Sequence, residues 1–490
     1  MIVSKGLKAG FARIDISPMT LSVPMGGFGA NELRMSNEIV DPLYAHTTAL
    51  ESGEESCLYI CVDLLGVSEK YIALYREAIS AATGLRKDRI FICATHTHAG
   101  PTLASKHPNT LKYAEEILTA KLVDAAKRAL ADLKPAKLSY GTGEAGRPGC
   151  RLTFDRHYYA VEESKKDNYK PEDLLEGVGK VRSGYLKGEG YCAVQHKEEA
   201  DHRIHVLRFT REAADDIVLF NFTSHSTFTG SPKRPQISSD YSGATINRLE
   251  ELLPDVKFAF MQGCCGNLVP ETEIEEEGIW GLTYPPRATT GFKGELPKVV
   301  GLRPWHKSHY AFGAMLAGDV FKILTQEMKD SETDTLAFRQ RIHAANYDHS
   351  KDELVPKAEE ALKVYHAEGH TPAAYAWCAQ FGLGSVYACG DIVTKSKLPK
   401  TGDVELNAIR IGDCAIATIP FEPFCSTGQH IKKDSPFAMT IANGYSCGYQ
   451  SYLSTKNSHP LSYEASRMRY EVGTAEILED QLIEMLNELK

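Results

Sequence analysis

Two histidines one residue apart, His96 and His98, end an apolar run and could carry out chemistry. The run, residues 90–94, predicts a short buried strand. If the extended conformation continues, both imidazoles project from the same face, because side chains alternate along a strand. Such a pair can bind a metal or transfer a proton, or it can be two hydrogen-bonded histidines at a strand end. The motif is short and occurs often by chance.

A third imidazole and a carboxylate stand at similar positions in the chain. His225 follows the apolar run 218–222, and Glu422 follows the run 415–420. Ligands of α/β proteins gather at strand ends, where loops supply polar groups on a rigid sheet. Taken singly, His225 is typical of a buried structural histidine and Glu422 of a helix cap or ion-pair partner. Together with His96 they form a His, His, Glu set, which leaves one zinc position open for water.

The elements that must position these residues alternate between strand and helix. The patterns predict strands at 11–16, 45–50, 56–64, 90–94, 137–140, 205–210, 217–223 and 256–261. They predict helices at 70–83, 113–133, 242–253, 310–328 and 474–489, and a hairpin at 407–419. This alternation indicates an α/β fold.

One large domain is expected over residues 1–490. The chain has 43% hydrophobic residues, enough for a large core, and shows neither an internal repeat nor a linker rich in Pro, Ser or Gly. Two polar excursions, near 145–200 and 271–305, interrupt the pattern. Long loops of this kind are often functional.

The charge and the apolar runs exclude several partners. The net charge is −9 and no basic stripe stands out, so nucleic acid is not expected to bind. No stretch reaches the ~18 apolar residues of a membrane helix, and the first ten residues lack the apolar core of a signal peptide. The 12 cysteines form no CxxC pairs and are expected to be reduced. These features predict a cytoplasmic protein without a membrane anchor.

Eight segments, in order along nearly the whole chain, resemble the neutral/alkaline ceramidases, zinc amidases that cleave the N-acyl bond of ceramide. The closest match is "ATHTHAGP" at 94–101. The others are "AGFARIDISP" with "MGGFG" (9–29), "CRLTFDR" (150–156), "TSHST" (223–227), "QGCCGNLVPE" (262–271), "IPFEPF" (419–424), "YQSYLST" (449–455) and "RYEVGTAE" (469–476). The resemblance implies an α/β domain of mixed β-sheets flanked by helices.

The resemblance also implies a zinc ion and its ligands. The ligand positions fall on His96, His225, Glu422 and Tyr452. Tyr452 is chosen because the family uses the second tyrosine of a Tyr-x-x-Tyr pair, and Tyr449 is the alternative. From the residues alone, the tyrosine run, made of Tyr445, Tyr449 and Tyr452, is typical of an aromatic core or a cleft wall.

Three catalytic roles are implied beside the metal. The resemblance places His98 and Arg151 there as substrate-contacting or proton-handling groups, and Tyr470 as a donor to the developing oxyanion. The inserted residues 456–466 loosen the alignment, so Tyr463 competes for the role of Tyr470.

The sequence departs from the family in ways that argue against ceramide as the substrate. Val269 aligns with the serine of the family's Gly-Asp-x-Ser-Pro-Asn motif. A signal peptide, the C-terminal β-sandwich domain of secreted members and a membrane-seeking stretch are not found in the sequence. We therefore expect a small soluble N-acyl substrate.

The predicted function is a zinc-dependent hydrolase acting on a linear amide bond. Zinc lowers the pKa of a bound water from ~15.7 to about 7 and polarises a carbonyl. Two alternatives use the same residues. The first is an esterase or phosphoesterase, which needs the same water and Lewis acid. The second is a binding protein that holds zinc and a ligand without turnover.

Overall fold

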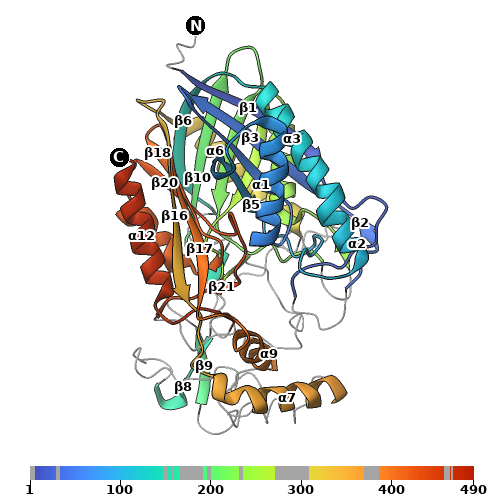
Figure 1. Cartoon of the computed structure of the whole chain (residues 1–490). Helices are drawn as coiled ribbons and strands as arrows, with labels where there is room; N and C mark the ends of the chain where they lie inside the picture. Colours follow the sequence, from blue (N-terminus) through green and yellow to red (C-terminus); the bar gives the residue numbers. More distant parts are fainter. Residues whose placement is uncertain are drawn as a thin grey trace, which may run out of the picture.

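The computed structural model describes most of the chain: residues 6–28, 34–146, 153–155, 158–165, 191–195, 200–230, 235–270, 308–368, 386–456, 464 and 467–490. The two expected polar excursions fall largely outside these residues. Within them the chain forms an α/β fold with several mixed sheets flanked by helices, as the sequence predicts (Figure 1).

The largest sheet has nine strands in the order β13-β11-β10-β6-β1-β3-β4-β5, with β15 paired to β6. Its strands are β1 (Leu7–Asp15), β3 (Tyr44–Ser52), β4 (Glu55–Val62), β5 (Ile90–Ala94), β6 (Lys134–Glu144), β10 (Arg203–Arg211), β11 (Asp216–Phe222), β13 (Val256–Gln262) and β15 (Lys329–Asp330). The β4/β5 and β11/β13 pairs are parallel and the other pairs antiparallel.

A second sheet has four strands in the order β16-β17-β18-β20. They are β16 (Leu336–Asn346), β17 (Thr401–Ile411), β18 (Cys414–Thr418) and β20 (Met439–Asn443). The shorter pairs are β2 (Glu38–Ile39) with β12 (Gln236–Ile237), β7 (Thr153–Asp155) with β14 (Leu268–Pro270), β8 (Tyr158–Glu162) with β9 (Tyr191–Gln195), and β19 (Glu422–Pro423) with β21 (Tyr452–Leu453).

The helices lie outside these sheets. The longer ones are α1 (Glu69–Thr83), α3 (Thr119–Ala131), α5 (Asp240–Leu252), α6 (His309–Gln326), α7 (Val355–Glu368), α9 (Val386–Lys395), α10 (Cys425–Asp434) and α12 (Thr474–Glu488). The short α2 (Pro108–Leu111) joins α3 through a π-helical segment, Lys112–Leu118. The single helix expected at 113–133 therefore changes its winding along its length.

Alternating apolar side chains build four layers. On β4, Leu58 and Ile60 pack towards α1 and α3, whereas Tyr59 and Cys61 pack towards the four-stranded sheet. The opposite face of that smaller sheet packs on α12, which lies on the other flank of the molecule from α1 and α3 (Figure 1). The order of the layers is thus helix, sheet, sheet, helix. Because side chains alternate between the two faces of a strand and both faces here are apolar, each sheet is covered on both sides.

Among the described residues, none of the helices has both the length and the apolar content that crossing a membrane requires.

Candidate metal centre

His96 and His225 meet although they follow strands at different places in the large sheet. His96 comes two residues after β5 and His225 three residues after β11. An isolated parallel bridge between Thr97 and Ser226 joins the two segments, and the backbone N–H of His98 donates to the Ser226 carbonyl at 3.0 Å. Strand ends thus deliver both imidazoles to one place, as expected for an α/β protein.

The two imidazoles point at one carboxylate oxygen. Nε2 of His96 lies 3.3 Å from Oε2 of Glu422, and Nε2 of His225 lies 3.4 Å from the same atom. All three residues are buried, with exposed fractions of 0%, 0% and 3%. The sequence-predicted His, His, Glu set therefore comes together in the fold.

The far nitrogen of each ring is held by backbone carbonyls. Nδ1 of His96 donates to the Leu65 carbonyl at 2.7 Å. Nδ1 of His225 lies 2.6 Å from the Cys265 carbonyl and 2.8 Å from the Leu268 carbonyl. A carbonyl can only accept, so Nδ1 carries the proton and Nε2 of each neutral ring presents a lone pair to the carboxylate.

This donor set fits a zinc ion. When both rings are neutral, the two Nε2 lone pairs and the Glu422 oxygen face one another with no proton between them. A divalent cation would be bound by all three atoms. Metal-binding histidines usually donate their other N–H to a carbonyl or carboxylate, which is the arrangement seen for both rings. The residues thus suit zinc by ligand type and by the contacts that orient them.

Glu422 lies on β19, which pairs with β21 so that Glu422 stands opposite Tyr452. Burial would raise the pKa of Glu422, but His96 and His225, when they carry a second proton, hold this pKa well below its ordinary value by their positive charge and hydrogen bonds. The hydroxyl of Tyr449 donates to the second carboxylate oxygen, Oε1, at 2.5 Å. Both candidate tyrosines therefore approach Glu422, Tyr449 through its hydroxyl and Tyr452 through the strand pairing.

Tyr445, the first tyrosine of the run, has a different role. Its ring stacks on the His96 imidazole with centroids 4.0 Å apart and an interplanar angle of 28°. Its hydroxyl lies 3.1 Å from Sγ of Cys265. Tyr445 thus forms a wall of the site, as the aromatic reading of the run suggests.

His98 also lies in the cluster, although the backbone before it is not extended as the strand pattern predicted. The chain leaves β5 at Ala94, and His96 has φ +61°, so the extended conformation does not continue through both histidines. Nε2 of His98 nevertheless lies 3.2 Å from Nε2 of His96. The candidate ligand atoms of His96, His98 and His225 all lie within 4.8 Å of one another. His98 stays half-buried, whereas the other two are fully buried.

The glycine turn near residue 27 packs against His98. Gly27 has φ +80°, and a Cβ there would lie 2.4 Å from Nδ1 of His98, so no larger residue fits. The ring of Phe28 contacts the imidazole edge-on at a centroid distance of 5.1 Å. The close approach of the backbone to His98 thus explains the second glycine of the motif, Gly27.

Arg34 is a residue of this region that the sequence patterns did not identify. Its guanidinium donates to the carbonyls of Gly26, Gly230 and His98, the last at 2.9 Å. It is 8% exposed, and burial lowers its pKa to about 10. A lone arginine in a polar stretch normally indicates a solvated side chain, so nothing in the sequence indicates that Arg34 binds three carbonyls.

The "QGCCGNLVPE" segment, beyond strand β13, braces two of the predicted ligands. It supplies the Cys265 and Leu268 carbonyls that hold His225. The N–H of Gly266 donates to the Pro423 carbonyl at 2.8 Å, and Oδ1 of Asn267 accepts from the N–H of Cys425 at 2.7 Å, both in the chain just after Glu422. Val269 pairs with Phe154 between β14 and β7.

Of the remaining predicted residues, the structure describes Tyr470, whose hydroxyl is bonded elsewhere. The Tyr470 hydroxyl donates to the side-chain oxygen of Gln450 and lies 3.3 Å from the Tyr347 hydroxyl. The Tyr470 ring stacks on the Tyr347 ring. Arg151 and Tyr463 lie outside the described residues.

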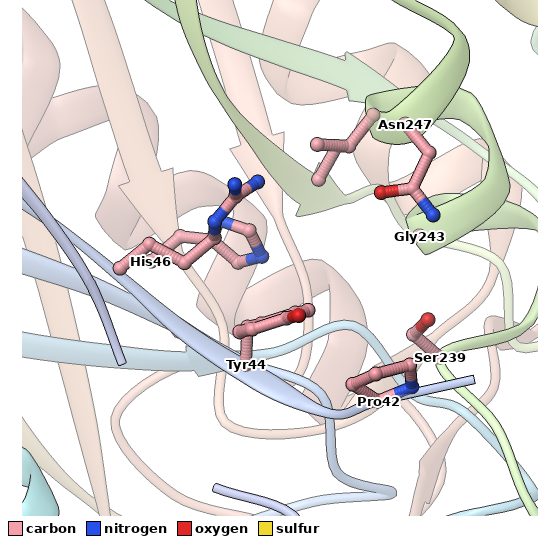
Figure 2. Close-up of a pocket in the computed structure, with 8 residues that line it drawn as sticks. Pro42, Tyr44, His46, Ser239, Gly243 and Asn247 are labelled. Carbon is pink, nitrogen blue, oxygen red and sulfur yellow. The ribbon is translucent and has the colours of Figure 1, made fainter. Parts of the chain in front are cut away.

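A separate small pocket of about 40 Å³ lies between β3 and α5. Tyr44 and His46 line it from one side, and Ser239 and Asn247 from the other (Figure 2). Its size suits one or two waters and is far below that of a metabolite site. This pocket is therefore too small for a metabolite, and the histidine cluster is kept as the candidate site.

Comparisons with known proteins place the fold. No family model and no curated protein matches the sequence. Among solved structures, the neutral ceramidase from Pseudomonas aeruginosa matches with a TM-score of 0.68 and 17% identity, over 99% of this chain and 74% of that chain. A structure described as a ceramidase complexed with C2 matches with a TM-score of 0.65 and 16% identity, over 99% and 75%. The likeness establishes that this chain has the fold of the neutral ceramidases.

Proposed function

We propose that this protein is a zinc-dependent hydrolase that cleaves a linear amide, or N-acyl, bond. The observation that carries the proposal is the convergence of Nε2 of His96 and Nε2 of His225 on Oε2 of Glu422, at 3.3 and 3.4 Å. The fold shared with ceramidases supports the amide bond as the scissile bond. The proposed ligands are these three residues and one tyrosine, either Tyr452 or Tyr449.

The zinc, when bound, supplies an activated water and polarises the substrate carbonyl. His98 is the residue suited to moving the proton, since it lies beside His96 and keeps contact with solvent. An unperturbed imidazole titrates near neutrality, which suits transfer of a proton to the leaving amine. Arg151 and Tyr470 enter the proposal, as substrate clamp and oxyanion donor, on the resemblance alone.

The proposed substrate is a small soluble N-acyl compound and not ceramide. The support is Val269, which leaves no hydroxyl at the position of the ceramidase motif serine.

The test combines zinc content with turnover. His225→Ala and Glu422→Ala should each lose the zinc that copurifies with the wild-type protein, because each removes one of three converging donors. His205→Ala is the matched control, since His205 is also buried but bonds to Thr142 outside the cluster. Stoichiometric zinc in both cluster variants would contradict the site.

The substrate panel separates the proposed reaction from its alternatives. We expect release of the amine from short N-acyl amides and little sphingosine from micellar ceramide. Hydrolysis of esters or phosphoesters without amide cleavage would favour the other hydrolase class. Bound zinc without any turnover would indicate a binding protein.

A further inference from the structure

The two edge strands of the large sheet come together at the metal centre. β5 and β13 are the first and last strands in the pairing order, yet their residues approach each other, so the sheet curls and brings its two ends close together. His96 follows β5, and His225 follows β11, the strand parallel to β13. The relative position of the two imidazoles therefore depends on the contact between the ends of β5 and β13, which we call the seam.

One buried side chain spans the seam. Gln262 ends β13 and is 0% exposed. Its Nε2 donates to the Thr95 carbonyl at 3.0 Å and to the Ser224 carbonyl at 3.0 Å. These carbonyls belong to the residues immediately before His96 and His225. Both N–H groups of a single carboxamide thus bind the two histidine-bearing turns.

The orientation of this carboxamide is fixed by its other end. Oε1 of Gln262 accepts from the N–H of Gly263 at 3.0 Å, so the NH₂ group must face the two carbonyls. Each carbonyl has a second donor, since Ser226 Oγ reaches the Thr95 carbonyl at 3.2 Å and the Tyr241 hydroxyl reaches the Ser224 carbonyl at 2.7 Å. Among the side-chain hydrogen bonds of the described residues, those of Gln262 alone reach both carbonyls. Its loss would remove the link from β13 to both turns and would leave each carbonyl with its other donor, while the Ser226 contacts between the turns stay in place.

We propose that Gln262 is a positioning residue of the metal centre, which sets the distance between the His96 and His225 imidazoles. This inference rests on the proposed zinc binding. Outer contacts that orient ligands typically change metal affinity by ~10–100-fold when they are removed. Loss of Gln262 should therefore act on zinc affinity more than on folding.

The experiment measures the zinc affinity of the full-length protein by competition with a chromogenic chelator. Gln262→Met keeps similar length without donors and should weaken zinc by ~10–100-fold. Gln262→Glu, a second variant in case the first does not fold, places an acceptor oxygen against two carbonyls and should weaken zinc at least as much. Circular dichroism and thermal melting of the metal-free proteins report folding separately.

The matched control is Asn221→Leu. Asn221 is also a buried carboxamide, one ladder position before Gln262 on the neighbouring strand, and donates to the Met261 carbonyl at 2.8 Å. It should lose stability but keep zinc affinity within about threefold, well below the change expected from a lost outer contact. Wild-type zinc affinity in folded Gln262→Met and Gln262→Glu, or an equal loss in Asn221→Leu, would overturn the proposal while leaving zinc binding intact. A wild-type protein that binds no zinc would overturn both.

Discussion

The Nε2 atoms of His98 and His96 lie 3.2 Å apart, and the two rings stand nearly perpendicular, at 86°. The surroundings of the rings differ. His96 is enclosed by Tyr445, His225 and Glu422, whereas His98 packs on the glycine turn and remains half-buried. This arrangement favours different roles for the two rings: the enclosed His96 binds the metal, and the more accessible His98 acts on the substrate.

His98→Ala should keep zinc and lose most turnover. A general acid or base typically contributes ~10²–10⁴ in rate, so kcat should fall by that factor while zinc content stays stoichiometric. Metal analysis, melting temperature and kcat on one preparation check this expectation.

The same variant distinguishes the other roles of His98. Loss of zinc from His98→Ala together with retention in His96→Ala would make His98 the ligand and His96 the bystander. A lower melting temperature with full specific activity of the folded protein would make His98 structural.

Tyr449→Phe and Tyr452→Phe decide which tyrosine acts on the centre. The Tyr449 hydroxyl lies 2.5 Å from Oε1 of Glu422, so we expect Tyr449→Phe to weaken zinc by ~10–100-fold, as loss of a ligand-orienting contact does. Tyr452→Phe should change zinc affinity by less than about threefold, below that range. The reverse order would support the assignment carried over by the resemblance. Chelator competition measures both variants alongside the wild type.

Much of the fold could be predicted because it is encoded locally. The run 90–94 predicts a strand, and β5 is Ile90–Ala94; the helical spacing over 70–83 becomes α1, Glu69–Thr83. These elements are predictable because apolar residues recur at different spacings in strands and helices, and this spacing shows which side chains face the core. Of the smaller sheet, the sequence predicted only the hairpin that became β17 and β18. The strand β16 lies in residues 334–405, where strand and helix signals are mixed, and β20 was not predicted.

The candidate site could be predicted only in part, because its geometry depends on contacts distant in sequence. His96, His225 and Glu422 stood out by residue type at strand ends. The positive φ of His96, the stacking of Tyr445 and the carbonyl contacts of Arg34 did not, because each is created by a neighbour from another segment. Tyr470 shows the converse, since its motif match says nothing of the hydrogen bond with Gln450 that occupies its hydroxyl.

Arg34→Gln should lower kcat by about tenfold to a hundredfold without loss of zinc. The guanidinium ties the His98 carbonyl to two other loops, and a displacement of about 1 Å at a reacting group can cost ~10² in rate. Added guanidinium ion should restore part of the activity of Arg34→Gly. Arg211→Gln is the control, because Arg211 is equally buried and also binds carbonyls, those of Ala9 and Asp215 among them, outside the site. Unchanged kcat in Arg34→Gln would contradict this role.

Asp63 gives a pH-dependent prediction. This buried carboxyl accepts hydrogen bonds from the N–H of Tyr44 at 2.8 Å and from the hydroxyl of Thr95 at 3.1 Å. Burial nevertheless raises its pKa to about 7, from the 3.8 of an exposed aspartate. Between these values the folded state holds a proton that the unfolded state has released. Stability contributed by this group is therefore present below about pH 4 and lost as the pH rises through 7.

Asp63→Asn removes this dependence, because an amide does not ionise and can still accept from Tyr44 while donating to Thr95. The melting temperature of the variant relative to wild type should increase from pH 4.5 to pH 7.5, since each pKa unit corresponds to about 1.4 kcal/mol. Melts are run with chelator, so that zinc release does not contribute. His46, whose pKa burial lowers to about 3, gives the opposite slope, and the comparison is repeated in His46→Gln. A difference in melting temperature that stays constant across this range in both backgrounds would show that Asp63 titrates alike in the folded and unfolded chain.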